Sequence, residues 1–588
     1  MPTVQTPRGG AWLIESASTD AFTPEQMTDE HRLIGATTAE FMTKEVVPVL
    51  DRLEAKDWAL ARTLMARCGE LGLLGLNVPE AYGGVELDKV SSVIVAEHLG
   101  QVASFAAAHG AQANLCILPI VMFGTEDQKV RYLPRLVSGE LVGAYALSES
   151  GSGSDALSAR ARAVRQEDGS FVISGEKMWI TNGGFADIIV VFAKVDGEHF
   201  SAFIVERSFQ GVSSGKEEHK MGLNGSSTTP IVLQDVRVPA ANLLGTIGKG
   251  HKVAFNVLNF GRFKLGAMVT GSAKVAIAEA ARYAASRKQF GQPIGKFGAI
   301  RHKLGEMTAR VFAVESLVYR TAGSIDAAVS STAGDRSQAV LAALEEFAVE
   351  ASIAKVAGSE TQTYVLDENV QIHGGNGFVR DYPAERHYRD ARVNRIFEGT
   401  NEINRLLIPG MLLKRAARGD LPLFAAARAL RDEVMSPSLP VEVDEAPLAA
   451  ERQAVRAFAK AALLLAGTAA ERYRERLDQE QELLLWLADV IIDVYAAESA
   501  LLRASQSTAS NHPTASLQAD AARLFVTSAA IRIEAAVREA LAALAEGDDL
   551  RVLLAALRRL LKVAPCDTVL LRRRLADETI AKGSYLFA

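Results

Sequence analysis

The 588-residue chain is poor in cysteine. Its three cysteines, Cys68, Cys116 and Cys566, lie far apart and without the CxxC spacing of a metal or redox site. The sequence therefore predicts neither a disulfide framework nor a thiolate metal centre, and it favours a reducing, cytoplasmic compartment. The ten histidines include no HExxH pattern, so no metal site of that kind is expected.

Long apolar runs and an excess of one charge are also missing. The longest apolar segment, residues 113–124, contains Pro119 and falls short of the roughly 18 residues that span a membrane, so we expect a buried helix. The N-terminus lacks the basic and apolar regions of a secretory signal. Lys and Arg number 64 against 70 Asp and Glu, and this net charge of −6 gives no reason to expect a nucleic-acid partner.

Hydrophobic periodicity divides the chain into helical and β-rich parts. An Asp168-Gly169 pair between two β-rich runs predicts a hairpin in the middle part. A proline-rich, acidic and aperiodic stretch over 435–447 indicates a linker. We therefore predict a mainly α fold with a central antiparallel β domain, divided into a helical domain (23–141), a β domain (142–246), a helical domain (247–415), a linker (416–446) and a C-terminal helical extension (447–588).

Two segments near the predicted change from helix to strand could contact a flat or anionic ligand. Residues 146–155 are rich in Ser and Gly, which leave backbone N–H and hydroxyl groups free, although a flexible connector has the same composition. Residues 177–184 combine Trp179 and Thr181 with a Gly pair, so they could wall a ring system and donate to its heteroatom. The tryptophan could equally belong to the core.

Two further segments follow in the second helical part. Residues 371–378 are Gly-rich, but no strand precedes them and no dinucleotide or P-loop pattern is met. Glu398 stands between Phe397 and Gly399, a setting that could raise its pKa and expose it to a substrate as a general base. The alternative is a carboxylate that stabilises the start of a helix.

The order and spacing of these segments resemble those of a known family. Residues 146–158 and 371–390 match two extended patterns of the acyl-CoA dehydrogenases, and residues 23–415 as a whole resemble that family. These are flavoproteins that oxidise acyl-CoA thioesters to trans-2-enoyl-CoA. The resemblance implies a helical, β-barrel-like, helical fold, FAD as cofactor, acyl-CoA as substrate and electron-transfer flavoprotein as electron acceptor in fatty acid β-oxidation.

The resemblance also implies roles for individual residues. Glu398 matches the catalytic base that removes the α-proton while the β-hydride passes to flavin N5. Positions that match FAD contacts are Tyr145, Leu147, Ser148, Ser154, Trp179, Thr181, Gln371, Gly374, Gly375, Thr400 and Asn401, with Arg287, Gln289 and Phe290 reaching the FAD of a neighbouring subunit. Positions that match acyl-CoA contacts are Ser154, Asn259, Arg262 and Gly399.

The length of the chain resembles one branch of the family. An extension of about 170 residues beyond the second helical domain is typical of the very-long-chain branch and its relatives, so a long-chain substrate and a homodimer are implied. Small residues over 106–111, interrupted by His109, could leave a deep acyl pocket. Tight helix packing would explain them almost equally well.

The end of the extension predicts a basic amphipathic helix. Arg551, Arg558, Arg559 and Lys562 share one face, with leucines around the rest. Such a helix could lie on an anionic membrane surface, but packing of its leucines into a bundle is favoured. Two other functions remain open at this stage: an acyl-CoA oxidase that uses oxygen, and an assembly or scaffold protein on a dehydrogenase fold.

Overall fold

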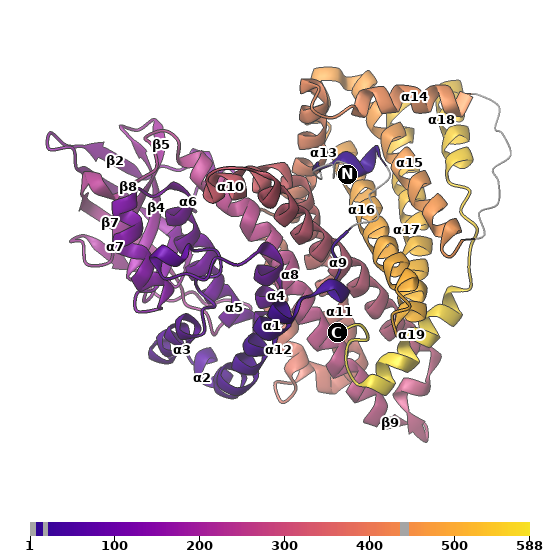
Figure 1. Ribbon diagram of the computed structural model, residues 1–588, viewed down its shortest axis with the longest axis horizontal. Helices are drawn as coiled ribbons and strands as arrows, with labels where there is room; N and C mark the ends of the chain where they lie inside the picture. The colour runs from indigo at the N-terminus through magenta and orange to yellow at the C-terminus, as the bar shows by residue number, and fades with distance from the viewer. Residues whose placement is uncertain (1–7, 16–20, 436–445) are drawn as a thin grey trace.

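The N-terminal part of the chain is helical, as expected. The computed structural model describes residues 8–15, 21–435 and 446–588 (Figure 1). A short 3-10 turn (Pro24–Gln26) opens this part, and the Thr23 and Gln26 side chains cap it reciprocally. The helices that follow are α1 (Asp29–Phe41), α2 (Leu50–Glu54), α3 (Trp58–Glu70), α4 (Lys89–Leu99), α5 (Ala103–Gly110), a π-helical segment (Ala111–Ile117), α6 (Leu118–Phe123) and α7 (Glu126–Val137).

The helical stretch Ala103–Phe123 corrects one expectation about apolar runs. It is long and apolar enough, by length and composition, to cross a membrane, although the sequence indicated no run of that length. Its α5, π-helical and α6 segments follow one another without a break, which joins apolar residues that the pattern separated. Because 78% of its most apolar window is buried inside the protein, it is a core helix.

The middle of the chain forms one sheet in the order β6-β7-β3-β2-β4-β5-β8, with β1 added beside β4. Most pairs are antiparallel, and the predicted hairpin joins β2 to β3 at Gly169. The exceptions are β1 and β2, which both run parallel to β4. The strands are β1 (Gly143–Ala146), β2 (Arg162–Arg165), β3 (Phe171–Thr181), β4 (Ile188–Val195), β5 (His199–Glu206), β6 (Val212–Ser214), β7 (Thr228–Val238) and β8 (Leu243–Leu244).

Strand β4 separates two hydrophobic cores. Val190 and Phe192 pack on the N-terminal helices, whereas Ile189 and Val191 pack inside the β domain. Because successive side chains point to opposite faces of a strand, an almost continuous apolar sequence is needed at this position. This strand fixes the sheet on the helices and so places β1 and the end of β3 at the helical domains.

The second helical part is built around long, buried helices. Helix α11 packs along α8, and a two-stranded hairpin follows α8 at the far edge from the β domain (Figure 1). The elements are α8 (Gly250–Ser286), β9 (Lys288–Gln289), β10 (Gln292–Pro293), α9 (Gly298–Ser331), α10 (Arg336–Glu346), α11 (Ala348–His373), α12 (Pro383–Ala391) and α13 (Asn401–Arg418).

The expected linker is only partly a linker. Residues 423–435 form helix α14 (Leu423–Met435), because Leu423 and Leu430 are spaced to bury one face against the bundle. Residues 436–445 lie outside the described part of the chain. The other boundaries drawn from the sequence stay a prediction.

The C-terminal extension is helical and shares a core with the preceding helices. Leucine and alanine side chains of α15, α16 and α17 belong to the same buried cluster as those of α4 and α9. Its helices are α15 (Ala449–Tyr473), α16 (Gln481–Ala509), α17 (Ala515–Leu544), α18 (Gly547–Leu560) and α19 (Thr568–Lys582). Helix α18 buries Leu557 and packs Leu553 and Leu554 on this core, which supports packing, rather than membrane contact, for the basic amphipathic helix.

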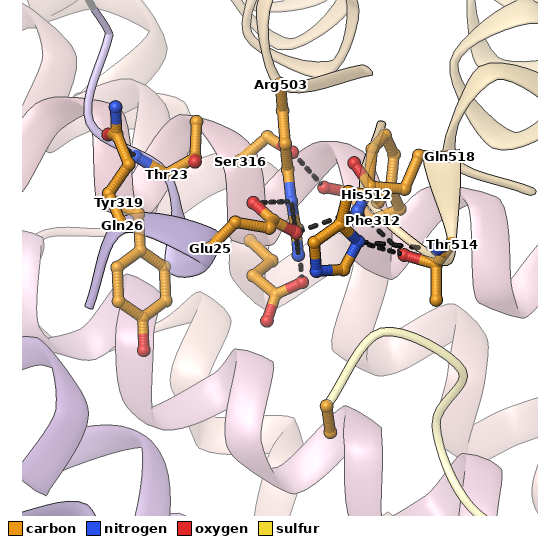
Figure 2. A network of polar contacts seen from close by, with 12 residues as sticks. Thr23, Glu25, Gln26, Phe312, Ser316, Tyr319, Arg503, His512, Thr514 and Gln518 are labelled. Atoms are coloured by element: carbon orange, nitrogen blue, oxygen red, sulfur yellow. Dashed lines mark hydrogen bonds and ion pairs between the residues drawn. The ribbon is translucent and has the colours of Figure 1, made fainter. Parts of the chain in front are cut away.

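A buried ion-pair network joins the extension to the rest of the protein (Figure 2). Arg503 of α16 donates to Glu25 of the N-terminal turn at 2.9 Å and to Glu315 of α9 at 2.5 Å, above the ring of Phe312. The Tyr585 hydroxyl donates to the same Glu315 carboxylate at 2.8 Å. Lys274 of α8 also pairs with Glu315. Four parts of the chain therefore meet at one carboxylate.

Removal of the Arg503 guanidinium is expected to destabilise the whole protein. Arg503→Met should lower the free energy of unfolding by on the order of 3–5 kcal/mol, because it removes the counter-charge of Glu25 and leaves Glu315 with Lys274 alone. The exposed Arg431, whose side chain is 69% accessible and pairs with Glu471, provides the control. Arg431→Met should cost less than about 1 kcal/mol. Equal shifts of the two urea midpoints would contradict this assignment.

Candidate active site

Glu398 lies in a left-handed turn that precedes α13. Its φ is 58° and that of Gly399 is 75°, a conformation that costs a residue with a side chain of order 1 kcal/mol or more. The Glu398 carbonyl accepts from Arg262 Nε at 3.2 Å and from Asn404 Nδ2 at 3.3 Å. The Gly399 carbonyl accepts from Lys355 Nζ at 2.8 Å and from the same Asn404 amide at 2.9 Å. These donors hold the turn in place.

Glu398 is half-buried, but its Oε2 atom is fully buried and has no hydrogen-bond partner among the residues that the structure describes. Burial raises the pKa of the carboxyl group to about 7, although the charges of Arg262 and Lys355 act in the opposite direction. The group lies against Gly261 of α8, where a Cβ atom would come within 2.6 Å of Oε2. Glu398 precedes the cap of α13, which is Thr400, and its carboxyl is not the one that caps this helix. This geometry is compatible with the predicted general base.

Tyr145 of β1 lies close enough for the charge of Glu398 to affect it. Burial, with a smaller contribution from that charge, raises the pKa of its phenol, and the hydroxyl has no partner. The ring meets Phe192 of β4 edge-on, with centroids 5.1 Å apart. A buried phenol and a buried carboxyl with unpaired oxygens mark a place where a polar ligand would complete the hydrogen bonding.

The loop after β1 is anchored to β3. Lys177 and Glu149 form a buried ion pair at 2.6 Å, and Lys177 Nζ also donates to the Leu147 carbonyl at 3.2 Å. The Met178 N–H donates to the Ser148 carbonyl at 2.9 Å. Further along this loop, Ser154 is exposed. The predicted positions 147 and 148 are therefore brought to β3, beside Trp179.

The end of β3 presents Trp179 outward. The strand is irregular between Lys177 and Ile180, and Trp179 has a φ of 58° and is 59% exposed. A bulge of this kind re-aims a side chain next to functional sites. Thr181 ends the strand two residues later. An exposed indole in a strained conformation is typical of a surface that stacks on a flat ligand.

The Gly-rich segment after α11 is open. Gly374 has a φ of 61°, and a Cβ atom at either Gly374 or Gly375 would meet no heavy atom within 4 Å. Gln371 is exposed on the last turn of the helix. The backbone can therefore be approached closely at this point, as the binding of a phosphate-bearing ligand requires.

The structure does not bring all the predicted residues together within one chain. Arg287, Gln289 and Phe290 lie on or beside the β9 hairpin, where Phe290 is 92% exposed, at the edge of the molecule away from the β domain (Figure 1). Their position suits contact with another molecule. Asn401, in contrast, is buried, and its amide is bonded to Lys355 and Ser359 beneath the turn.

Sequence reasoning missed several groups around Glu398. Gly261 is the contact surface for the carboxyl, and Lys355 and Asn404 hold the turn. Lys355 could have been noticed as the only lysine in a buried run over 348–356 of α11. Arg262 donates to the Glu398 carbonyl and, through Nη1, to Asn259 at 3.0 Å. A cavity of about 640 Å³ between α14, α15 and α16 contains none of the predicted site residues.

Comparison with known proteins identifies the family. The probable acyl-CoA dehydrogenase of Bacillus subtilis (strain 168) is 47% identical to this chain over 98% of both proteins. The chain belongs to the acyl-CoA dehydrogenase family. The mitochondrial very long-chain specific acyl-CoA dehydrogenase of Bos taurus is 36% identical over 89% of this chain and 82% of its own length. The crystal structure of an acyl-CoA dehydrogenase complexed with FAD from Bacillus anthracis superposes with a TM-score of 0.96, at 46% identity, over 98% of this chain and 100% of the other.

The family models agree with this membership. The acyl-CoA dehydrogenase N-terminal, middle and C-terminal domains match residues 28–140, 144–236 and 248–412, and a further C-terminal domain model matches 457–559 in the extension. The predicted family, fold class and enzyme class, an FAD-dependent oxidoreductase, are confirmed. The open Gly374–Gly375 backbone, the unpaired Tyr145 and Glu398 oxygens and the exposed Trp179 are compatible with a bound flavin and substrate.

The contact between Gly261 and Glu398 gives a direct test of the site. Gly261→Ala should displace the carboxylate, because the new methyl group would overlap it, and should lower acyl-CoA dehydrogenase turnover by about 100-fold. Gly410 of α13 is the matched control, because a Cβ atom added there would meet no heavy atom within 4 Å. Gly410→Ala should keep full turnover. Turnover is measured with an artificial electron acceptor. Wild-type turnover in both variants would contradict the placement of Glu398 at the reaction centre.

Proposed function

We propose that this enzyme oxidises long-chain acyl-CoA to trans-2-enoyl-CoA, with Glu398 as the base that removes the α-proton. The observation that carries this assignment is the buried Glu398 carboxyl, whose Oε2 has no partner and whose pKa is raised to about 7. A base with a pKa near the working pH is ionised in a useful fraction of molecules and still accepts a proton effectively.

The surroundings of Glu398 suit the removal of a weakly acidic proton. The α-proton of a thioester needs a base held at the right place and a site that excludes water. Arg262, Asn404 and Lys355 fix the backbone of the turn, so the carboxyl is the part left free to move toward a substrate. Gly261 limits that movement on the side of α8.

The proposed flavin site surrounds this base. Tyr145, Leu147, Ser148, Trp179 and Thr181 would contact the ring system, and Gln371, Gly374 and Gly375 would contact the adenosine and pyrophosphate. FAD, when bound, supplies the acceptor for the hydride. For the substrate we propose contacts from Ser154, Asn259, Arg262 and Gly399. Thr400 stays a proposed cofactor contact, whereas Asn401 is buried and its side chain is bonded within the protein, which argues against a direct contact from it.

Replacement of the base should separate catalysis from folding. Glu398→Gln keeps the size of the side chain but cannot accept the proton, so turnover should fall at least about 10⁴-fold. The purified variant should remain yellow, with a melting temperature close to the wild type. The assay is acyl-CoA-dependent bleaching of the flavin under anaerobic conditions. If Glu398→Gln still bleaches at the wild-type rate, another residue is the base.

The preference for long chains rests on similarity and on one helix surface. The chain shares its length and its C-terminal extension with the very long-chain relative described above. In α5 and the π-helical segment, Ala107 and Gly110 are only half-buried, and Asn114 on the same face meets Lys264 of α8 at 3.2 Å. Lys264 lies one turn after Gly261, so this small-residue face points to the helix that carries the Glu398 contact.

A larger side chain at Gly110 should shorten the accepted acyl chain. A Cβ atom there would meet only the Asn114 amide, at 3.6 Å, so Gly110→Leu can extend into the space between the helices. The ratio of kcat/KM for long over short acyl-CoA should fall about tenfold or more. Gly110→Ala, which adds a single methyl group, should leave the ratio nearly unchanged. An unaltered ratio in Gly110→Leu would favour helix packing as the reason for the small residues.

The electron acceptor and the assembly are proposed on surface features. The exposed Trp179 beside the proposed flavin ring gives an electron-transfer flavoprotein a place to dock. Arg287, Gln289 and Phe290, exposed on the β9 hairpin, would reach the FAD of a second subunit in a homodimer. We propose a cytoplasmic location. Fast reoxidation of the reduced, product-bound flavin by oxygen would instead indicate an acyl-CoA oxidase.

A further inference from the structure

The amine of Lys355 connects the Glu398 turn to the interior of the protein. Its Nζ atom donates to the Gly399 carbonyl at 2.8 Å and to Asn401 Oδ1 at 2.6 Å. The side chain is fully buried in α11. A buried ammonium group is costly unless hydrogen bonds and negative charge compensate it, so a lysine here needs a structural or chemical reason.

A chain of polar contacts continues from Lys355 to the C-terminal extension. The Asn401 amide donates to Glu360 Oε1 at 3.0 Å, and Glu360 receives two bonds from Arg405, at 2.7 and 2.8 Å. Arg405 Nε then donates to Asp489 of α16 at 2.7 Å. Helices α11, α13 and α16 therefore all contribute to the position of the amine. Because the Lys355 amine, Asn401, Glu360 and Arg405 each bond to at least two other groups, the amine has little freedom to leave the turn.

We propose that Lys355 is a positioning residue for catalysis: its ammonium group holds the left-handed Glu398–Gly399 turn and favours the ionised form of the Glu398 carboxyl. This proposal rests on the proposed role of Glu398 as the base. The Lys355 amine bonds to the Gly399 carbonyl and to Asn401, so it acts on Glu398 through the turn and through its charge. The Glu398 conformation, with a φ of 58°, needs such support because the turn is unfavourable for a residue with a side chain.

The charged groups around Glu398 and Lys355 determine the direction in which Lys355 shifts the pKa of Glu398. Burial lowers the pKa of Lys355 to about 7, and the nearby Glu398 carboxylate acts to raise it. Burial raises the pKa of Glu398 to about 7, and the positive charges of Arg262 and Lys355 act to lower it. The groups that face Glu398 are Arg262 from α8, Lys355 from α11 and Tyr145 from β1, and those that face Lys355 are Glu398, Arg262, Glu360 and Glu402.

Removal of the Lys355 charge should move the titration of Glu398 upward. An opposite charge nearby lowers the pKa of a carboxyl, so its loss in Lys355→Met raises that pKa. The acidic limb of the kcat–pH profile should shift up by about one pH unit. The maximal kcat should fall about 10- to 100-fold, because the turn is less well held, and KM should change less than threefold. Lys355→Arg keeps a cation and a donor and should restore the position of the limb.

Asn401→Ala provides a second variant if Lys355→Met folds poorly. It removes the 2.6 Å contact but keeps the ammonium group, so kcat should fall about tenfold while the acidic limb stays in place. A purely structural role would lower the melting temperature in both variants without moving the limb in either. That result, or an unchanged kcat in Lys355→Met, would overturn the proposal.

A readout without turnover separates this proposal from the role of Glu398. The protonated-carboxyl stretch of Glu398 can be followed by infrared difference spectroscopy of the substrate-free holoenzyme against pH, and is assigned by its loss in Glu398→Gln. The band should disappear at higher pH in Lys355→Met than in the wild type, and at the wild-type pH in Lys355→Arg. Turnover by Glu398→Gln would refute the base, whereas an unmoved band in Lys355→Met refutes only the role of Lys355.

Discussion

The carboxylate of Glu315 is the contact on which the arrangement of the helices depends. It is buried in α9 and accepts from Arg503 of α16, Lys274 of α8 and the Tyr585 hydroxyl near the C-terminus. Lys274 also binds Glu97 of α4. The low polarity of the interior strengthens each of these interactions and makes the loss of any partner expensive. The network therefore fixes α8, the helix that carries Gly261 and Arg262, relative to both ends of the chain.

The active site uses the same principle on a smaller scale. The unfavourable backbone of Glu398 is held by donors from three helices, Arg262 of α8, Lys355 of α11 and Asn404 of α13, while the carboxyl itself is left without a partner. Strong bonds to the backbone and none to Oε2 suit the proposed role of Glu398 as a general base, since a hydrogen bond to that oxygen would have to be broken before the proton moved. In the proposed mechanism, the backbone of Glu398 is held rigidly and its carboxyl group accepts the proton.

Local sequence patterns predicted the features that depend on contacts between residues close together in the chain. The hairpin turn at Gly169 depends on residues within a few positions of one another, and the sequence predicted it. Contacts between distant residues were not predicted: Lys355 reaches Gly399 across 44 positions and Arg503 reaches Glu315 across 188. Hydrophobic periodicity predicts that one face of a helix is buried, but it does not predict which element packs against that face.

Two other features of the fold could not be predicted from the sequence, for related reasons. Helix α14 lies beside a proline-rich stretch that predicted a linker, although Leu423 and Leu430 are spaced for burial on one helix face. The parallel pairing of β1 and β2 with β4 depends on long connections, which leave no signal comparable to a tight turn. Hydrophobic periodicity predicted the order of the domains and the family resemblance supplied the roles of the candidate residues, but neither predicted the hydrogen bonds that hold Glu398 in place.

The burial of α9 makes the core of the second helical part depend on the C-terminal extension. Residues 311–322 of this helix are buried without interruption, because α8 and α11 pack on one side and α16, α17 and α19 on the others. A helix covered on one side only would alternate apolar and polar positions with a period near 3.6. Loss of the extension would therefore expose buried side chains of α9. One of them is Arg320, which would also lose its ion pair with Glu498 of α16.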